Sequence, residues 1–171
     1  MEEAIINRVA KSGIETIDLA QFFPVQEIVV LDIKAWLFHG LILKEKDFRQ
    51  YLEEHDWAQY TGKAVCMVCT ADAIIPLWAY MLVAAKLQPF TNDYIFGNRE
   101  NYLSQHYAKT LVQEINPADF AEKRIVIKGC ADKDVSESAY VEITRLLLPV
   151  AKTIMFGEPC STVPVFKKAK S

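Results

Sequence analysis

The sequence predicts an α/β protein, with a three-layer α/β/α sandwich built around a mainly parallel sheet. Two observations carry this prediction. Short apolar segments of strand length alternate along the chain with segments of helical periodicity. The strand segments are continuously apolar, which is typical of parallel strands buried on both faces. Right-handed crossovers between such strands place helices on both sides of the sheet.

The first third of the chain contains several predicted elements. Residues 3–12 space their apolar members helically and predict a short opening helix, with Gly13 as its C-cap. A β-branched segment at 27–33 predicts a strand, and 41–43 is a candidate for another. Residues 45–54 place apolar side chains on one face among charges, which indicates an amphipathic surface helix.

From residue 64 onward, strands and helices alternate regularly. We expect the strands at 64–69, 124–127 and 153–156 to be neighbours in one sheet, because solid apolar segments of this kind fill the centre of parallel sheets. The other predicted elements are a strand at 94–96, helices at 76–87, 98–115 and 135–148, and an extended segment at 163–166.

Length and composition predict a single domain spanning residues 1–171. The chain contains no low-complexity segment, no Gly/Ser linker and no internal repeat that we detect, so nothing in it suggests a boundary. It is 51% hydrophobic and 24% charged, which is typical of globular proteins. The slightly positive mean hydropathy of +0.08 leaves apolar surface that a homo-oligomer could bury.

The net charge and the N-terminal sequence restrict the cellular compartments and the classes of partner that we expect. A net charge of -3 excludes the basic field that phosphate backbones require, so we expect no nucleic acid partner. The acidic start lacks the pattern of a signal peptide and no apolar segment is long enough to span a bilayer, which predicts a cytoplasmic protein without a membrane partner. In that compartment the four cysteines are expected to stay reduced, without disulfides.

The cysteines mark the candidate site. In open α/β sheets, ligands bind at the loops that leave the carboxyl ends of the strands. Cys69 ends a predicted strand, Cys130 and Cys160 each come shortly after one, and the loop after Cys69 also carries Asp72. Soft thiolates select zinc or iron–sulfur species, so these residues predict a metal site, with Asp72 or Glu158 as an oxygen ligand.

The pair Cys66 and Cys69 has the spacing of a C-x-x-C motif, but both residues lie in a predicted strand. Side chains alternate along a strand, so positions three apart face opposite sides and cannot hold the same ion. Cys66 is therefore interpreted as a small apolar core residue, and the motif is rejected as a unit.

Several strings of the sequence resemble those of a bacterial family of unknown function, DUF2480, over nearly the whole chain. The resemblance implies no established activity. Members of that family often lie near genes of the iron–sulfur (SUF) assembly machinery, which implies iron–sulfur assembly proteins as partners. The matching strings are Asp32–Lys34 (DIK), Cys69–Tyr80 (CTADAIIPLWAY), Lys128–Cys130 (KGC), Glu137–Thr144 (ESAYVEIT) and Gly157–Pro164 (GEPCSTVP).

Three functions therefore remain open. The leading hypothesis is a thiolate metal-binding or iron–sulfur-assembly accessory protein, with Cys69, Cys130, Cys160 and Asp72 at the sheet edge. The second is a thiol-dependent enzyme in which one of Cys130 and Cys160 attacks and the other resolves. The third is a binding or scaffold protein with inert cysteines. Metal content and thiol reactivity discriminate among them.

Overall fold

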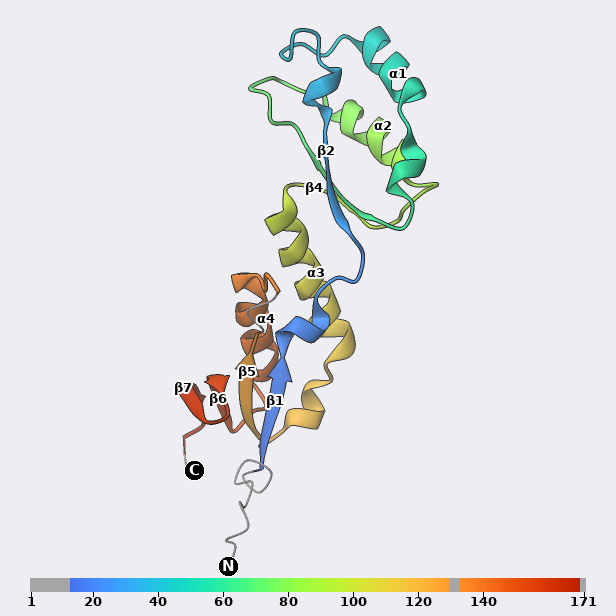
Figure 1. Ribbon diagram of the computed structural model, residues 1–171. Helices are drawn as coiled ribbons and strands as arrows, with labels where there is room; N and C mark the ends of the chain where they lie inside the picture. The colour runs from blue at the N-terminus through green and yellow to red at the C-terminus, as the bar shows by residue number, and fades with distance from the viewer. Residues whose placement is uncertain (1–12, 130–132, 170–171) are drawn as a thin grey trace, which may run out of the picture. The chain divides into compact units, whose positions relative to one another are not determined.

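The computed structural model describes residues 13–129 and 133–169, so the predicted opening helix at 3–12 and Cys130 lie outside the described residues. The chain divides into two compact units (Figure 1). The central unit is Pro24–Tyr102, and the terminal unit combines Met1–Phe23 with Leu103–Ser171. Each unit has its own sheet and its own core.

The central unit contains a sheet of three parallel strands in the order β2-β3-β4. Its helical elements connect successive strands, as parallel pairing requires. The strands are β2 (Ile28–Asp32), β3 (Ala64–Val68) and β4 (Tyr94–Phe96); the helices are α1 (Glu45–Glu54) and α2 (Leu77–Leu87), with short 3-10 turns η2 (Ile33–Trp36) and η3 (Trp57–Tyr60).

Both helices of the central unit pack into one core cluster with the sheet. On α2 the buried residues recur at a spacing of four, which gives this helix one inward stripe. On the strands, alternate residues point to that same side. The cluster includes Leu31, Val65 and Met67 from the strands, Phe48 and Leu52 from α1, and Ala79, Val83 and Leu87 from α2.

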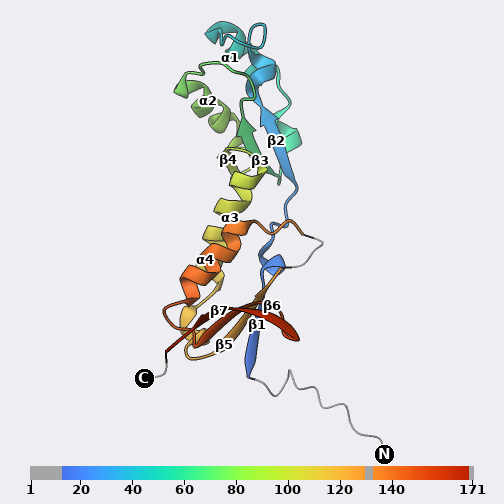
Figure 2. The ribbon, with the colours of Figure 1, turned by 90° about the vertical axis from the view of Figure 1, so that its left-hand side faces the viewer.

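The terminal unit contains a four-stranded sheet in the order β1-β5-β6-β7 (Figure 2). The first three strands are parallel, and β7 forms an antiparallel hairpin with β6. The strands are β1 (Ile14–Asp18), β5 (Arg124–Lys128), β6 (Thr153–Glu158) and β7 (Ser161–Lys167); α3 (Arg99–Glu114) enters this unit at Leu103, and α4 (Glu137–Leu147), η1 (Leu19–Phe22) and η4 (Pro117–Phe120) complete it.

The core of the terminal unit is built in the same way. Helices α3 and α4 contribute side chains to one cluster with alternate residues of the strands. The cluster includes Ile17, Ile125, Ile127 and Ile154 from the strands, Tyr107, Leu111 and Ile115 from α3 and its end, and Ala139, Ile143 and Leu147 from α4.

The predicted α/β class and the mainly parallel pairing are confirmed. The three-layer sandwich and the single domain over residues 1–171 stay predictions. One prediction is wrong: β5 and β6 are parallel neighbours, but β3 belongs to the other sheet. Strand β1 was not predicted, because Glu15 and Thr16 interrupt its apolar residues and are exposed at an edge of the sheet.

The two units also contain an internal repeat, which corrects the expectation that none exists. The segment β3-α2-β4 corresponds to β5-α4-β6 at a constant separation along the chain, with the same pattern of burial along the two helices. The shared residues are few and scattered, so the repeat becomes evident only once the elements are aligned. They include Ala79 and Ala139, Tyr80 and Tyr140, Leu87 and Leu147, Pro89 and Pro149, Phe96 and Phe156, and Gly97 and Gly157.

Candidate functional site

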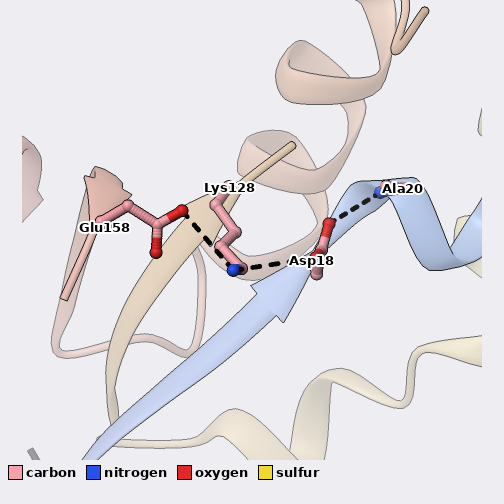
Figure 3. Close-up of polar contacts among 4 residues, drawn as sticks. All are labelled: Asp18, Ala20, Lys128 and Glu158. Atoms are coloured by element: carbon pink, nitrogen blue, oxygen red, sulfur yellow. Dashed lines mark hydrogen bonds and ion pairs between the residues drawn. The ribbon is translucent and has the colours of Figure 1, made fainter. Parts of the chain in front are cut away.

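The carboxyl ends of β1, β5 and β6 place three charged side chains together in the terminal unit (Figure 3). The Nζ atom of Lys128 lies 3.9 Å from Oδ2 of Asp18 and 3.5 Å from Oε1 of Glu158. Asp18 is fixed by its other oxygen, because Oδ1 accepts a hydrogen bond from the Ala20 backbone N–H at 3.0 Å. A strand end and a helix cap thus position the same carboxylate.

This cluster carries two carboxylates and one ammonium group, so its net charge is negative. All three groups are partly exposed, and ion pairs of that kind each contribute only about 0–1 kcal/mol to stability. The cluster therefore contributes little to folding stability, and its main effect is the electrostatic field that it creates at this edge of the sheet. A net negative edge attracts cations and disfavours a free anion.

Cys160 lies beside this cluster in the chain, in the turn of the β6-β7 hairpin. Glu158 and Ser161 are paired across the hairpin, which leaves Pro159 and Cys160 as a two-residue turn. The Cys160 side chain is exposed and free. The hairpin turn thus presents this thiol at the carboxyl edge of β6.

Cys130 lies outside the described residues, but the strand that precedes it, β5, is described and neighbours β6. Strand β5 ends at Lys128 and pairs in parallel with β6. The chain segments that carry Cys130 and Cys160 therefore leave the same edge of one sheet, from neighbouring strands.

Cys69 and Asp72 belong to the central unit and follow β3. Cys69 is half-buried, and its Sγ atom lies 4.0 Å from the carbonyl oxygen of Ala71. Asp72 is exposed. The expectation that one sheet edge carries all these residues is wrong, because β3 lies in a different sheet from β5 and β6. Among the residues that the structure describes, no three histidine, cysteine, aspartate or glutamate side chains are grouped closely enough to hold a metal ion.

Cys66 is fully buried in β3, as its interpretation as a core residue requires. Burial raises the pKa of its thiol, whereas the smaller influence of Arg99 lowers that pKa and the smaller influence of Asp93 raises it. A buried thiol with a raised pKa is a poor nucleophile and a poor ligand. Cys66, Cys69 and Cys160 are all free cysteines.

Sequence reasoning missed the aspartate that ends β2. The Thr70 hydroxyl donates to Oδ2 of Asp32 at 2.5 Å, and the Thr70 backbone N–H donates to Oδ1 at 3.2 Å. Burial alone would favour the neutral acid, but the hydrogen bonds from Thr70 and Lys34 hold the pKa of Asp32 below its usual value. Asp18 occupies the corresponding place in the terminal unit. The signal that could have found both is an Ile-x-x-Ile/Leu-Asp string, in which Asp caps the next turn.

Tyr107 was also missed. Its side chain is fully buried on α3, and its hydroxyl has no hydrogen-bond partner among the residues described here. Burial, followed by the neighbouring Tyr140 and the negative charges of Asp134 and Asp18, raises the pKa of Tyr107 to about 12. The hydroxyl therefore stays protonated near neutral pH.

Comparisons with known proteins add one match. The family model described as "Protein of unknown function (DUF2480)" matches residues 3–168. Neither the curated proteins nor the solved structures give a match. Within the described ranges, none of the helices is both long and apolar enough to cross a bilayer.

Proposed function

The chain belongs to the family described as Protein of unknown function (DUF2480), and from that premise we propose that it is a thiolate metal-binding protein. The proposed ligands are Cys130 and Cys160, at the carboxyl edge of the terminal unit's sheet. The observation that carries the proposal is the parallel pairing of β5 with β6. Neighbouring strands lie roughly 4.8 Å apart, so loops that leave them at one edge start close enough to bind one ion.

The donor set favours zinc or an iron–sulfur species. Two thiolates are soft ligands, and zinc–sulfur bonds of about 2.3 Å require two sulfurs within about 4 Å of each other. Glu158 begins the same hairpin turn as Cys160 and offers an oxygen. Cys69 and Asp72 follow β3 in the other sheet and are not part of this proposed set.

The charges at the edge support a metal rather than a reactive thiol. Lys128 is balanced by two carboxylates, Asp18 and Glu158, so the site lacks the net positive charge that stabilises a free thiolate. The same negative charge attracts a divalent cation. Cys130 and Cys160 would hold such a cation, and its charge would favour their thiolate forms.

The proposal extends to a role as an accessory in iron–sulfur assembly, with iron–sulfur assembly proteins as partners. Its support is the genomic neighbourhood of the family and the exposure of Cys160, which leaves one ligand accessible to another protein. A cytoplasmic location, where thiols stay reduced, is part of the same proposal.

Metal analysis of the protein purified without oxygen tests the proposal. We expect zinc, or iron with sulfide, bound in stoichiometric amount, and we expect Cys160→Ser to lose it while the circular dichroism spectrum is unchanged. Serine keeps the volume of cysteine but ligates poorly. Ser161→Ala, at the next position, should retain the metal and serves as the control.

The remaining variants assign the other ligands. Cys130→Ser should lose the metal as Cys160→Ser does, whereas Cys69→Ser, beside the other sheet, should retain it. A wild-type protein without metal, or a Cys160→Ser variant that binds as much as wild type, would overturn the proposal.

The second candidate is a thiol-dependent enzyme, which the exposure of Cys160 favours. In that case the metal-free protein should form a Cys130–Cys160 disulfide under a mild oxidant, with one sulfur attacking an oxidised partner and the other resolving it. Mass spectrometry after alkylation without reductant detects that bond. If both metal and disulfide are absent, the cysteines are inert and the protein is a binding or scaffold protein.

A further inference from the structure

Strand β4 (Tyr94–Phe96) is at the edge of the central unit's sheet, where no described strand pairs with its outer side. Asp93, just before the strand, accepts a backbone hydrogen bond from β3, and Gly97, just after it, donates one to β3, each at 2.9 Å. Backbone groups alternate between the two sides of a strand. Tyr94 and Phe96 therefore direct their N–H and C=O groups outward. We refer to this outer side as the β4 edge.

The β4 edge lacks the charges and prolines that commonly prevent a strand from pairing further. Edge strands are often protected by such residues or by β-bulges. In the terminal unit, the edge strand β1 carries the exposed Glu15, and β7 carries Pro164 and an irregular register with β6. Strand β4 is short, but Tyr94, Ile95 and Phe96 include neither a charge nor a proline. Its edge can therefore accept another strand.

The internal repeat shows what covers the corresponding edge in the terminal unit. Strand β4 corresponds to β6, and β3 corresponds to β5. Strand β6 pairs with β5 on one side and with the antiparallel strand β7 on the other. In that pair Val163 lies opposite Phe156, which is the counterpart of Phe96. The same molecule thus contains a model for a strand bound at the β4 edge.

The side chains beside the β4 edge are more exposed than their counterparts. The rings of Phe96 and Tyr80 have centroids 4.9 Å apart, and those of Phe156 and Tyr140 have centroids 5.7 Å apart. Phe96 is 64% exposed, whereas Phe156, beside β7, is 47% exposed. Met81, next to Tyr80 on α2, is 71% exposed. An added strand would cover apolar surface here as well as pair with backbone groups.

We propose that the β4 edge binds an extended segment of a partner protein, which adds to the sheet as an antiparallel strand in the way that β7 adds to β6. Strand addition of this kind is a common recognition mode, in which backbone hydrogen bonds give affinity and alternate side chains give specificity. The segment carries an apolar, β-branched residue opposite Phe96, as β7 carries Val163 opposite Phe156. Such cross-strand pairs stabilise a sheet.

The segment comes from a different protein rather than from a second copy of this chain. Strand β7 is the strand of this chain that pairs in the required way, and β6 already occupies its pairing side. The edge strand β1 of a second copy would place the charged Glu15 among apolar side chains.

Backbone hydrogen exchange followed by NMR tests the proposal. The probe is a synthetic peptide with the β7 sequence, Ser161–Lys167 (STVPVFK), because the repeat predicts that β4 accepts what β6 accepts. The amides of Tyr94 and Phe96 should exchange about tenfold more slowly once roughly nine-tenths of the chains hold peptide. The Ile95 amide already faces β3, so its exchange should change little and provides an internal control.

Variants of the protein and of the peptide test the side-chain contacts. Phe96→Ala should bind the peptide about fivefold more weakly, with an unchanged circular dichroism spectrum, because it removes the partner of the peptide's valine. A peptide with Val163→Asp should also bind more weakly. Val25→Ala changes a 97% exposed valine before β2, the opposite edge strand, and should bind as the wild type does.

Three results would overturn the proposal. The first is unchanged exchange of Tyr94 and Phe96 at about 1 mM peptide. The second is protection of β2 in place of β4. The third is slow exchange of Tyr94 and Phe96 without peptide that becomes faster on dilution, because a second copy would then cover the edge.

Discussion

At the scale of single residues, aspartates at strand ends organise both units. Asp18 and Asp32 each end a strand and accept a hydrogen bond from the backbone N–H two residues later. Asp32 also binds Thr70 across the sheet edge, whereas Asp18 lies beside Lys128. The two aspartates thus cap the following turn in the same way, but their side chains contact a different residue in each repeat.

We expect Thr70→Val to lower the free energy of unfolding by about 1 kcal/mol at pH 7, because it removes the hydroxyl that stabilises the Asp32 carboxylate. The pKa of Asp32 is lowered in the folded state, so its contribution is present above the unfolded pKa near 3.8 and is lost as the pH falls through the folded value. Urea denaturation at pH 7 and at acid pH should therefore show a smaller pH dependence for the variant.

Thr61→Val is the matched control for this prediction. The Thr61 hydroxyl donates to the Ala58 carbonyl at 2.8 Å, which is a neutral acceptor. Its loss should lower stability equally at both pH values. An unchanged pH dependence in Thr70→Val would contradict the assigned role of Asp32.

At the scale of elements, the sequence predicted most of the helices and strands. Helix α1 and strands β3 and β5 lie where periodicity placed them, because amphipathic or solid apolar segments leave few alternatives. Strand β1 was missed because an edge strand with exposed polar residues resembles a loop. The predicted strand at 41–43 is wrong, since Ile42 forms only an isolated bridge with Phe38.

The packing of α4 against β5 gives a second prediction. A side chain at Gly129, just after β5, would overlap the Tyr140 hydroxyl on α4. Gly129→Ala should therefore lower the free energy of unfolding by about 1–3 kcal/mol. Tyr140→Phe, which removes that hydroxyl, should recover part of the loss in the double variant, as measured by thermal or urea unfolding.

Gly62→Ala is the control for the packing argument. Gly62 has a positive φ of 70° but open space around it, so alanine there costs backbone strain alone. Tyr140→Phe should not rescue it. If Tyr140→Phe rescues neither variant, the close approach of α4 to Gly129 does not limit stability.

At the scale of the whole molecule, the sequence did not reveal that the strands are divided between two separate sheets. β3 and β5 are equivalent strands of a repeat, so both are solid apolar segments and both precede a helix. Periodicity cannot assign equivalent strands to different sheets. The candidate site was affected in the same way: Cys160 was correctly placed after β6, but Cys69 and Asp72 belong to the other sheet.

The measurement that tests the central claim most directly is X-ray absorption at the metal edge of the anaerobically purified protein. Thiolate ligation by Cys130 and Cys160 predicts a shell of sulfur neighbours at about 2.3 Å that disappears in Cys160→Ser. A shell containing only nitrogen or oxygen at about 2.0–2.1 Å would contradict thiolate ligation at this edge of the terminal unit.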